Sequence, residues 1–151
     1  MPNGTHTVEL QVPIENIWNF VSDMNNWAPL VPGYIEHEIL SEKQSTWKFK
    51  GDLGFMKKTV KLQIDILEWI EPSKVTFDLK GLSDNFTGGG YFEAEKITDA
   101  ATRMTGHLDI TAGGMMGAMI NTILKNFVPE TAQQLTEAIA GKINEIEGVT
   151  V

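Results

Sequence analysis

The sequence predicts an α+β fold in which a curved, seven-stranded antiparallel sheet wraps around one long C-terminal helix, with two short helices after the first strand. Two patterns predict it. Residues 115–146 carry apolar side chains at steps of three and four, the spacing of one face of a helix. Residues 33–112 contain several runs of alternating apolar and polar side chains joined by short turns, which is typical of antiparallel strands. A chain of 151 residues is long enough for one sizeable core, so we expect a single domain over residues 1–151.

The first strand is expected at residues 5–12, where every second side chain is apolar. Pro13 then begins a short helix, because proline is tolerated in the first helical turn. A second short helical segment covers residues 22–30, and Pro29 and Pro32 keep it short.

Six more strands are expected after Gly33. The links between them are short, and parallel neighbours would need crossovers of a dozen residues or more, so an antiparallel meander follows. The chain shows no internal repeat and no linker that would separate domains. The expected strands cover residues 34–40, 45–51, 60–66, 75–81, 86–97 and 102–111.

The long helix of residues 115–146 has one continuous apolar face and one polar face. An isolated helix cannot bury such a face, so the sheet must cover it. Pro129 interrupts the backbone hydrogen bonds of this helix, at a cost of about 3 kcal/mol, and predicts a kink. The simpler interpretation is that the kink follows the curvature of the sheet, and the alternative is a hinge for ligand entry.

Charge and composition exclude several classes of function. The net charge of −8 disfavours nucleic acids and anionic membranes as partners. The absence of cysteine excludes disulfides and thiolate chemistry. The first residues lack the basic segment and apolar run of a signal peptide, so we expect none, and the apolar runs are far shorter than the roughly 20 residues that span a bilayer. We expect a soluble, cytoplasmic protein without a membrane span.

Several short motifs accompany this order of elements, namely residues 13–20, Leu30-Val-Pro-Gly33, Gly88-Gly-Gly90, Thr102-Arg103-Met104 and Gly113-Gly114. The order and the motifs together resemble the START-like helix-grip (SRPBCC) superfamily, and within it the CoxG-like group associated with carbon monoxide dehydrogenase. The resemblance implies a fold that holds apolar or amphipathic ligands, lipids included, between sheet and helix. It also implies two alternatives, an accessory role for a molybdenum-containing redox enzyme and a polyketide cyclase-like or hydrolase-type activity.

Glycines recur on the face of the sheet that is expected to point inward, at Gly51, Gly88, Gly90 and Gly106. One interpretation is that they let the sheet bend or let the helix approach closely. The other is that they open a ligand cavity, and the two are compatible.

Methionines cluster where the last strand meets the helix, and methionine adapts well to irregular partners. The simpler interpretation is that these methionines belong to the core, and the alternative is that they contact a ligand. Trp27, Leu30 and Trp47 are candidates for the rim of a cavity, with ordinary packing as the alternative.

A cavity of several hundred Å³ is expected between sheet and helix. Its expected ligand-binding residues are Trp47, Phe49, Phe77, Phe86, Gly88, Met104, Met116, Met119, Ile120 and Phe127.

Catalytic, cofactor and metal sites find little support. His6, His37 and His107 form no metal-ligand spacing. His107 falls on the polar side of its strand, so we expect its side chain to point to solvent. His6 and His37 fall on the same side of their strands as apolar residues, which is the side expected to point inward. The run Gly88–Gly90 lacks the lysine and helix of a phosphate loop.

A general acid or base would have to come from a short set of residues that parity or loop position suggests, and each is more simply structural. We therefore expect ligand binding without obvious catalysis, and no resident cofactor or metal. That set is His37, Asp52, Asp84 and Tyr91.

Overall fold

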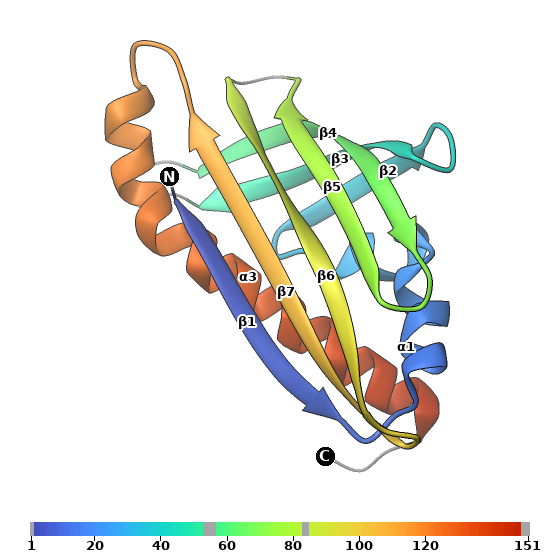
Figure 1. The fold of residues 1–151 in the computed structure, drawn as a ribbon. Helices are drawn as coiled ribbons and strands as arrows, with labels where there is room; N and C mark the ends of the chain where they lie inside the picture. The colour runs from blue at the N-terminus through green and yellow to red at the C-terminus, as the bar shows by residue number, and fades with distance from the viewer. Residues whose placement is uncertain (1, 53–56, 83–84, 149–151) are drawn as a thin grey trace.

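A computed structural model of the protein describes residues 2–52, 57–82 and 85–148. Within them, seven strands and a long C-terminal helix follow the predicted order (Figure 1). The helices are α1 (Ile14–Val21), α2 (Met24–Trp27), the 3-10 turn η1 (Ala28–Leu30) and α3 (Gly117–Glu147). The strands are β1 (Asn3–Leu10), β2 (Tyr34–Ile39), β3 (Gln44–Asp52), β4 (Lys57–Ile70), β5 (Lys74–Gly81), β6 (Phe86–Thr98) and β7 (Ala101–Ala112).

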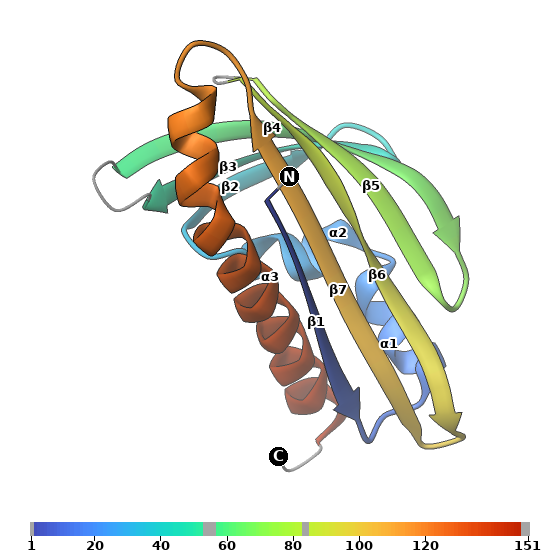
Figure 2. The same cartoon turned by 60° about the vertical axis from the view of Figure 1, so that its left-hand side comes forward.

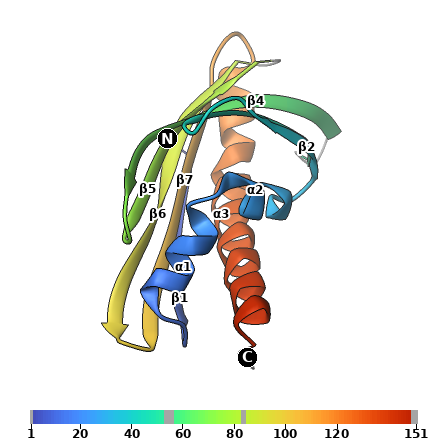
Figure 3. The same ribbon diagram turned by 90° about the vertical axis from the view of Figure 1, so that its right-hand side faces the viewer.

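All strands pair antiparallel in one sheet with the order β1-β7-β6-β5-β4-β3-β2. The strands β2 to β7 form a meander, and β1 joins it at the free edge of β7. Figure 3 shows the sheet arching from β6 and β7 across β4 to β2, with α2 and α3 in the hollow beneath it. The predicted fold class is confirmed.

The helix α3 packs mainly on β1 and β7, along which it runs in Figure 2. Glycines allow this close approach. A Cβ atom at Gly106 of β7 would overlap the Oγ1 atom of Thr136, and a Cβ atom at Gly4 of β1 would overlap the Cα atom of Pro129. Small side chains at Ala132 and Ala140 are buried along the same helix. The helix therefore lies close to the sheet because neither surface carries bulk there.

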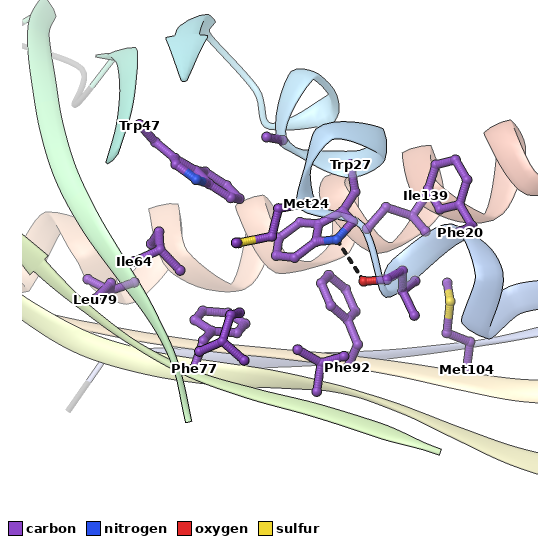
Figure 4. Packing of buried hydrophobic residues seen from close by; sticks show 14 of the residues in the cluster. Phe20, Met24, Trp27, Trp47, Ile64, Phe77, Leu79, Phe92, Met104 and Ile139 are labelled. Carbon is purple, nitrogen blue, oxygen red and sulfur yellow. Dashed lines mark hydrogen bonds between the residues drawn. The ribbon is translucent and has the colours of Figure 1, made fainter. Parts of the chain in front are cut away.

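Core side chains surround Trp27, the largest of the fully buried side chains at 1% exposure (Figure 4). Its ring lies 5.2 Å from that of Trp47, 6.3 Å from that of Phe77 and 5.1 Å from that of Phe92. Its indole N–H donates to the carbonyl oxygen of Val21 at 3.0 Å. This part of the hollow is filled by protein side chains.

The elements differ from the prediction in small ways. β1 begins and ends two residues earlier than expected, and α3 begins at Gly117, after Met115 and Met116. The expected apolar face of α3 extends too far at both ends, since Met116, Met119 and Ile146 are exposed. Pro129 does not end the helix, which continues to Glu147 and changes direction along its length (Figure 1).

Candidate functional site

A cavity of about 320 Å³ lies between the sheet and the first half of α3. Four strands, the β7–α3 corner and α3 enclose it. Among its described lining residues, Asn85 alone has a polar side chain, and none is titratable. The lining residues are Phe49 and Gly51 of β3, Val60 and Leu62 of β4, Asn85 and Phe86 at the start of β6, Ile110 and Ala112 of β7, the corner residues Gly113, Met115 and Met116, and Ile120, Leu124 and Phe127 of α3.

Burial distinguishes a floor from a rim. Val60, Leu62 and Leu124 are at most 6% exposed and form the floor. The exposed lining residues belong to two adjacent segments, Asn85 and the corner of residues 113–116. The Gly113 N–H donates to the carbonyl oxygen of Asn85 at 2.9 Å, so the two segments meet. The cavity therefore has an apolar inner end and one solvent-facing rim.

The corner between β7 and α3 is held by a pair of hydrogen bonds. The Ala112 N–H donates to the side-chain oxygen of Asn121 at 2.8 Å, and the Asn121 amide donates to the Ala112 carbonyl oxygen at 2.9 Å. Gly114 adopts φ +79°, a conformation that glycine adopts without strain, and allows the turn. These contacts position the first turns of α3 over the cavity.

Residue size explains where the free space lies. Near Gly106 the glycine lets α3 approach the sheet, and around Trp27 large aromatic rings fill the hollow. Where β3 and β7 face the first turns of α3, the small residues Gly51, Ala112 and Gly113 contribute little volume. Unfilled space therefore remains at the rim end of the hollow.

Five of the ten expected ligand-binding residues line this cavity. They come from β3, β6, the corner and α3, segments far apart in the sequence. They are Phe49, Phe86, Met116, Ile120 and Phe127.

Three of the other five lie in packed parts of the protein. Trp47 and Phe77 surround Trp27 in the core, and Met104 is 1% exposed and lies beside Ile17 and Val21 of α1. Trp27 and Trp47, which were candidates for the rim of a cavity, are therefore packing residues. The short helices fill that end of the hollow.

The remaining two lie elsewhere. Gly88 borders a shallow depression with Asp78, Tyr91 and Asp109, and a Cβ atom there would overlap the Asp109 carbonyl oxygen. That close contact supports sheet bending as the role of Gly88. Met119 is 45% exposed and does not line the cavity.

Several lining residues were not expected from the sequence. Leu62 and Leu124 had the correct parity or helical face, but nothing in the sequence separated them from other core residues. Asn85 lies in a polar stretch before a strand and gave no signal. Two other lining residues had been considered at the level of the sequence, Gly51 as a glycine that opens a cavity and Met115 as part of the methionine cluster. The described lining residues outside the expected ligand-binding set are Gly51, Val60, Leu62, Asn85, Ile110, Ala112, Gly113, Met115 and Leu124.

Two of the four candidate acids and bases, His37 and Tyr91, do not line this cavity. His37 lies half-buried on β2 and is hydrogen-bonded to the Tyr34 hydroxyl at 2.6 Å and to the Asn25 side-chain oxygen at 2.7 Å. Tyr91 stacks on His107 with ring centroids 5.1 Å apart. The side chains of Asp52 and Asp84 lie outside the described residues.

The other histidines are engaged in contacts between elements. His6 faces α3, where its Nε2 atom lies 3.3 Å from the Glu137 carboxylate. His107 is half-buried rather than fully solvated, and its Nδ1 atom lies 2.7 Å from the Thr5 hydroxyl. Among the residues that the structure describes, no three His, Asp or Glu side chains are placed to hold a metal ion.

Asp99 lies at the end of β6, remote from the cavity, and its carboxyl has a perturbed pKa. A hydrogen bond from Lys96 and the charge of that lysine hold the pKa of Asp99 below its ordinary value. This pair is fully exposed and has no link to the cavity.

Within the described ranges, no helix combines the length and apolarity needed to cross a bilayer.

A protein-family model matches residues 1–146 of this chain. Similar solved structures include a conserved protein from Geobacillus kaustophilus, with TM-score 0.77, 18% identity and 95% of each chain covered. A START superfamily protein from Mycobacterium smegmatis has TM-score 0.74 and 18% identity, covering 95% of this chain and 98% of that one. The ZhuI aromatase/cyclase from a Streptomyces species has TM-score 0.72 and 16% identity, covering 98% of each chain. No curated protein matches. At these identities the similarity shows the fold alone.

Proposed function

We propose that the protein binds or carries a small hydrophobic or amphipathic molecule, starting from the START-like fold that it shares with a START superfamily protein. The molecule occupies the cavity between the sheet and α3. The observation that carries the proposal is the cavity itself, with its volume of about 320 Å³ and, among its described lining residues, the single polar side chain of Asn85.

The size and chemistry of the cavity match those of small-molecule sites. Such sites are concave, mainly apolar, and roughly 300 to 1,000 Å³ in volume. An apolar cavity gives water too few hydrogen-bonding partners, so an apolar guest is favoured over water. The cavity also reaches the surface through the exposed rim of residues 113–116. An apolar molecule is therefore favoured over water inside the cavity and can enter it through the rim.

Filling the cavity with protein tests the proposal. Ile120 lines it from α3, so Ile120→Trp places an indole in the space that a ligand would use. We expect the small neutral fluorescent probe 1-naphthylamine to bind the native protein and to bind this variant at least about tenfold more weakly, a change of about 1.4 kcal/mol. Fluorescence titration measures both dissociation constants.

A matched control is available on the same helix. Ile146 is 58% exposed and lies outside the cavity, so Ile146→Trp should leave probe binding unchanged. Native mass spectrometry of the protein purified from its own host should additionally show a retained molecule. Failure of the probe to bind the native protein, or equal binding by Ile120→Trp, would overturn the proposal.

Catalysis in the same cavity is a second candidate, favoured by the fold similarity to an aromatase/cyclase. Acid–base chemistry there would need titratable groups close to the substrate. None of the described lining residues supplies one, so the groups would have to come from side chains such as Asp52 and Asp84. Incubation with a linear poly-β-ketone thioester and mass analysis of the products tests this. Products made by the native protein and absent with Ile120→Trp would favour catalysis over simple binding.

The finer predictions from the sequence remain predictions. The START-like fold is shared by binding proteins and cyclases, so it does not identify a CoxG-like protein, a lipid ligand or a redox-enzyme partner. A cytoplasmic location is likewise still a prediction. Affinity capture from the native host, followed by identification of a molybdenum-containing dehydrogenase, would support the accessory role.

A further inference from the structure

Asn85 supplies the one polar side chain among the described lining residues, and its place at the rim suggests the kind of molecule that fits. Asn85 is exposed and immediately precedes β6, so its amide lies where the cavity meets solvent. The inner end of the cavity, around Leu62 and Leu124, offers no hydrogen bond from a described side chain. A ligand with one polar end and one apolar end therefore fits in one orientation, with its polar end at the rim and its apolar end at the inner end of the cavity.

The backbone of Asn85 is tied to Gly113, while its side-chain amide makes no hydrogen bond to the rest of the described protein. Its backbone carbonyl accepts the Gly113 N–H, and its side-chain amide packs against Gly113, where a Cβ atom would lie 3.0 Å from the nitrogen and 3.2 Å from the oxygen. That side chain forms no hydrogen bond with any other described residue. Its donor and acceptor are therefore both available to a ligand at the rim.

Charge distinguishes between possible head groups. None of the described lining residues is basic, so these residues offer an anionic head no opposite charge. The net charge of −8 further opposes the approach of an anion. An amide donates through its NH2 group to the oxygen of a hydroxyl or a carbonyl, and its own oxygen accepts from a hydroxyl.

The volume limits the size of the guest. At roughly 30 Å³ for each water-sized group, a cavity of about 320 Å³ holds about ten such groups. This corresponds to a short alkyl chain or one substituted aromatic ring, with the head group extending toward the rim.

From these observations, and resting on the proposed binding function, we infer that the ligand is an uncharged amphipathic molecule of about ten to fifteen non-hydrogen atoms. Its single hydrogen-bonding head group, a hydroxyl or carbonyl, contacts the Asn85 amide. Its apolar end lies between β4 and α3.

Three probes of similar shape test this inference: propylbenzene, 4-propylphenol and 4-propylbenzoate. Calorimetric titration gives their dissociation constants with the native protein and with Asn85→Leu. The variant should bind 4-propylphenol about 2- to 10-fold more weakly, the effect of one hydrogen bond. It should bind propylbenzene at least as well as the native protein does. The native protein should bind 4-propylbenzoate at least about tenfold more weakly than 4-propylphenol at neutral pH.

Asn126→Leu is the matched control, because Asn126 is exposed on α3 and does not line the cavity. It should change none of the three dissociation constants, and both variants should melt at the native temperature. If propylbenzene binds but Asn85→Leu weakens all probes equally or none, the head-group inference fails and the binding function stands. The inference fails in the same way if 4-propylbenzoate binds as tightly as 4-propylphenol. If none of the probes binds, both proposals fail.

Discussion

Gly106 offers a sharp test of how α3 is held against the sheet. A Cβ atom at this position would overlap the Oγ1 atom of Thr136, while it would lie 3.4 Å from Thr136 Cβ and 3.3 Å from Phe92 Cε1. The obstacle is therefore a single hydroxyl group. Because Thr136 is only 1% exposed and its hydroxyl donates to the Ala132 carbonyl oxygen at 2.7 Å, it cannot turn away without cost.

We expect Gly106→Ala to lower the free energy of unfolding by about 1 to 3 kcal/mol, the usual cost of overpacking a core. Each kcal/mol corresponds to about 2 to 4 °C in Tm for a chain of this size. Thr136→Ala alone should cost about 1 kcal/mol through its lost hydrogen bond. In the double variant the new Cβ has room, so the combined loss should be smaller than the sum by about 1 kcal/mol or more.

Urea denaturation of the four proteins measures this coupling. Gly141→Ala is the control, because Gly141 lies in α3 with nothing near an added Cβ atom. It should stabilise the protein by up to about 1 kcal/mol, since alanine is the better helix former. Additive losses from Gly106→Ala and Thr136→Ala would refute the steric explanation of the close approach.

Two further predictions concern the corner and the core. Asn121→Leu should cost about 1 to 3 kcal/mol in urea denaturation, because it leaves both buried backbone groups of Ala112 without partners. Asn126→Leu, on the exposed side of α3, should stay within about 0.5 kcal/mol of the native protein, and equal losses would argue against the corner bonds. Trp27→Ala should cost about 3 to 5 kcal/mol in thermal unfolding, because Trp27 is at the centre of the packed aromatic residues. A cost below about 1 kcal/mol would contradict that central role.

Local patterns predicted the elements well because they depend on local physics. Alternation along β4 and β5 identified strands with Leu62, Ile64 and Phe77 on the buried face, as the structure confirms. Short links implied an antiparallel meander, which the strand order confirms. The ends of α3 were less well predicted, since Met116 and Ile146 are apolar but exposed.

The location of the cavity could not be predicted in the same way. Trp47 and Phe49 lie two residues apart on one strand and share parity, yet Trp47 packs on Trp27 and Phe49 lines the cavity. Parity shows that a side chain points inward but not what it meets there. Trp27, which belongs to a separate short helix, determines which of the two is covered.

The sequence by itself determined the order of the strands and helices, the antiparallel sheet and the apolar face of α3, because these follow from spacing along the chain. Only the tertiary structure decided where the hollow is filled and where it stays open. That outcome depends on how closely α3 approaches the sheet at Gly106, on the rings around Trp27, and on the small residues opposite the first turns of α3. Volumes contributed by distant segments add up only after the chain has folded, so a cavity and the amide at its rim have no signature in any one stretch of sequence.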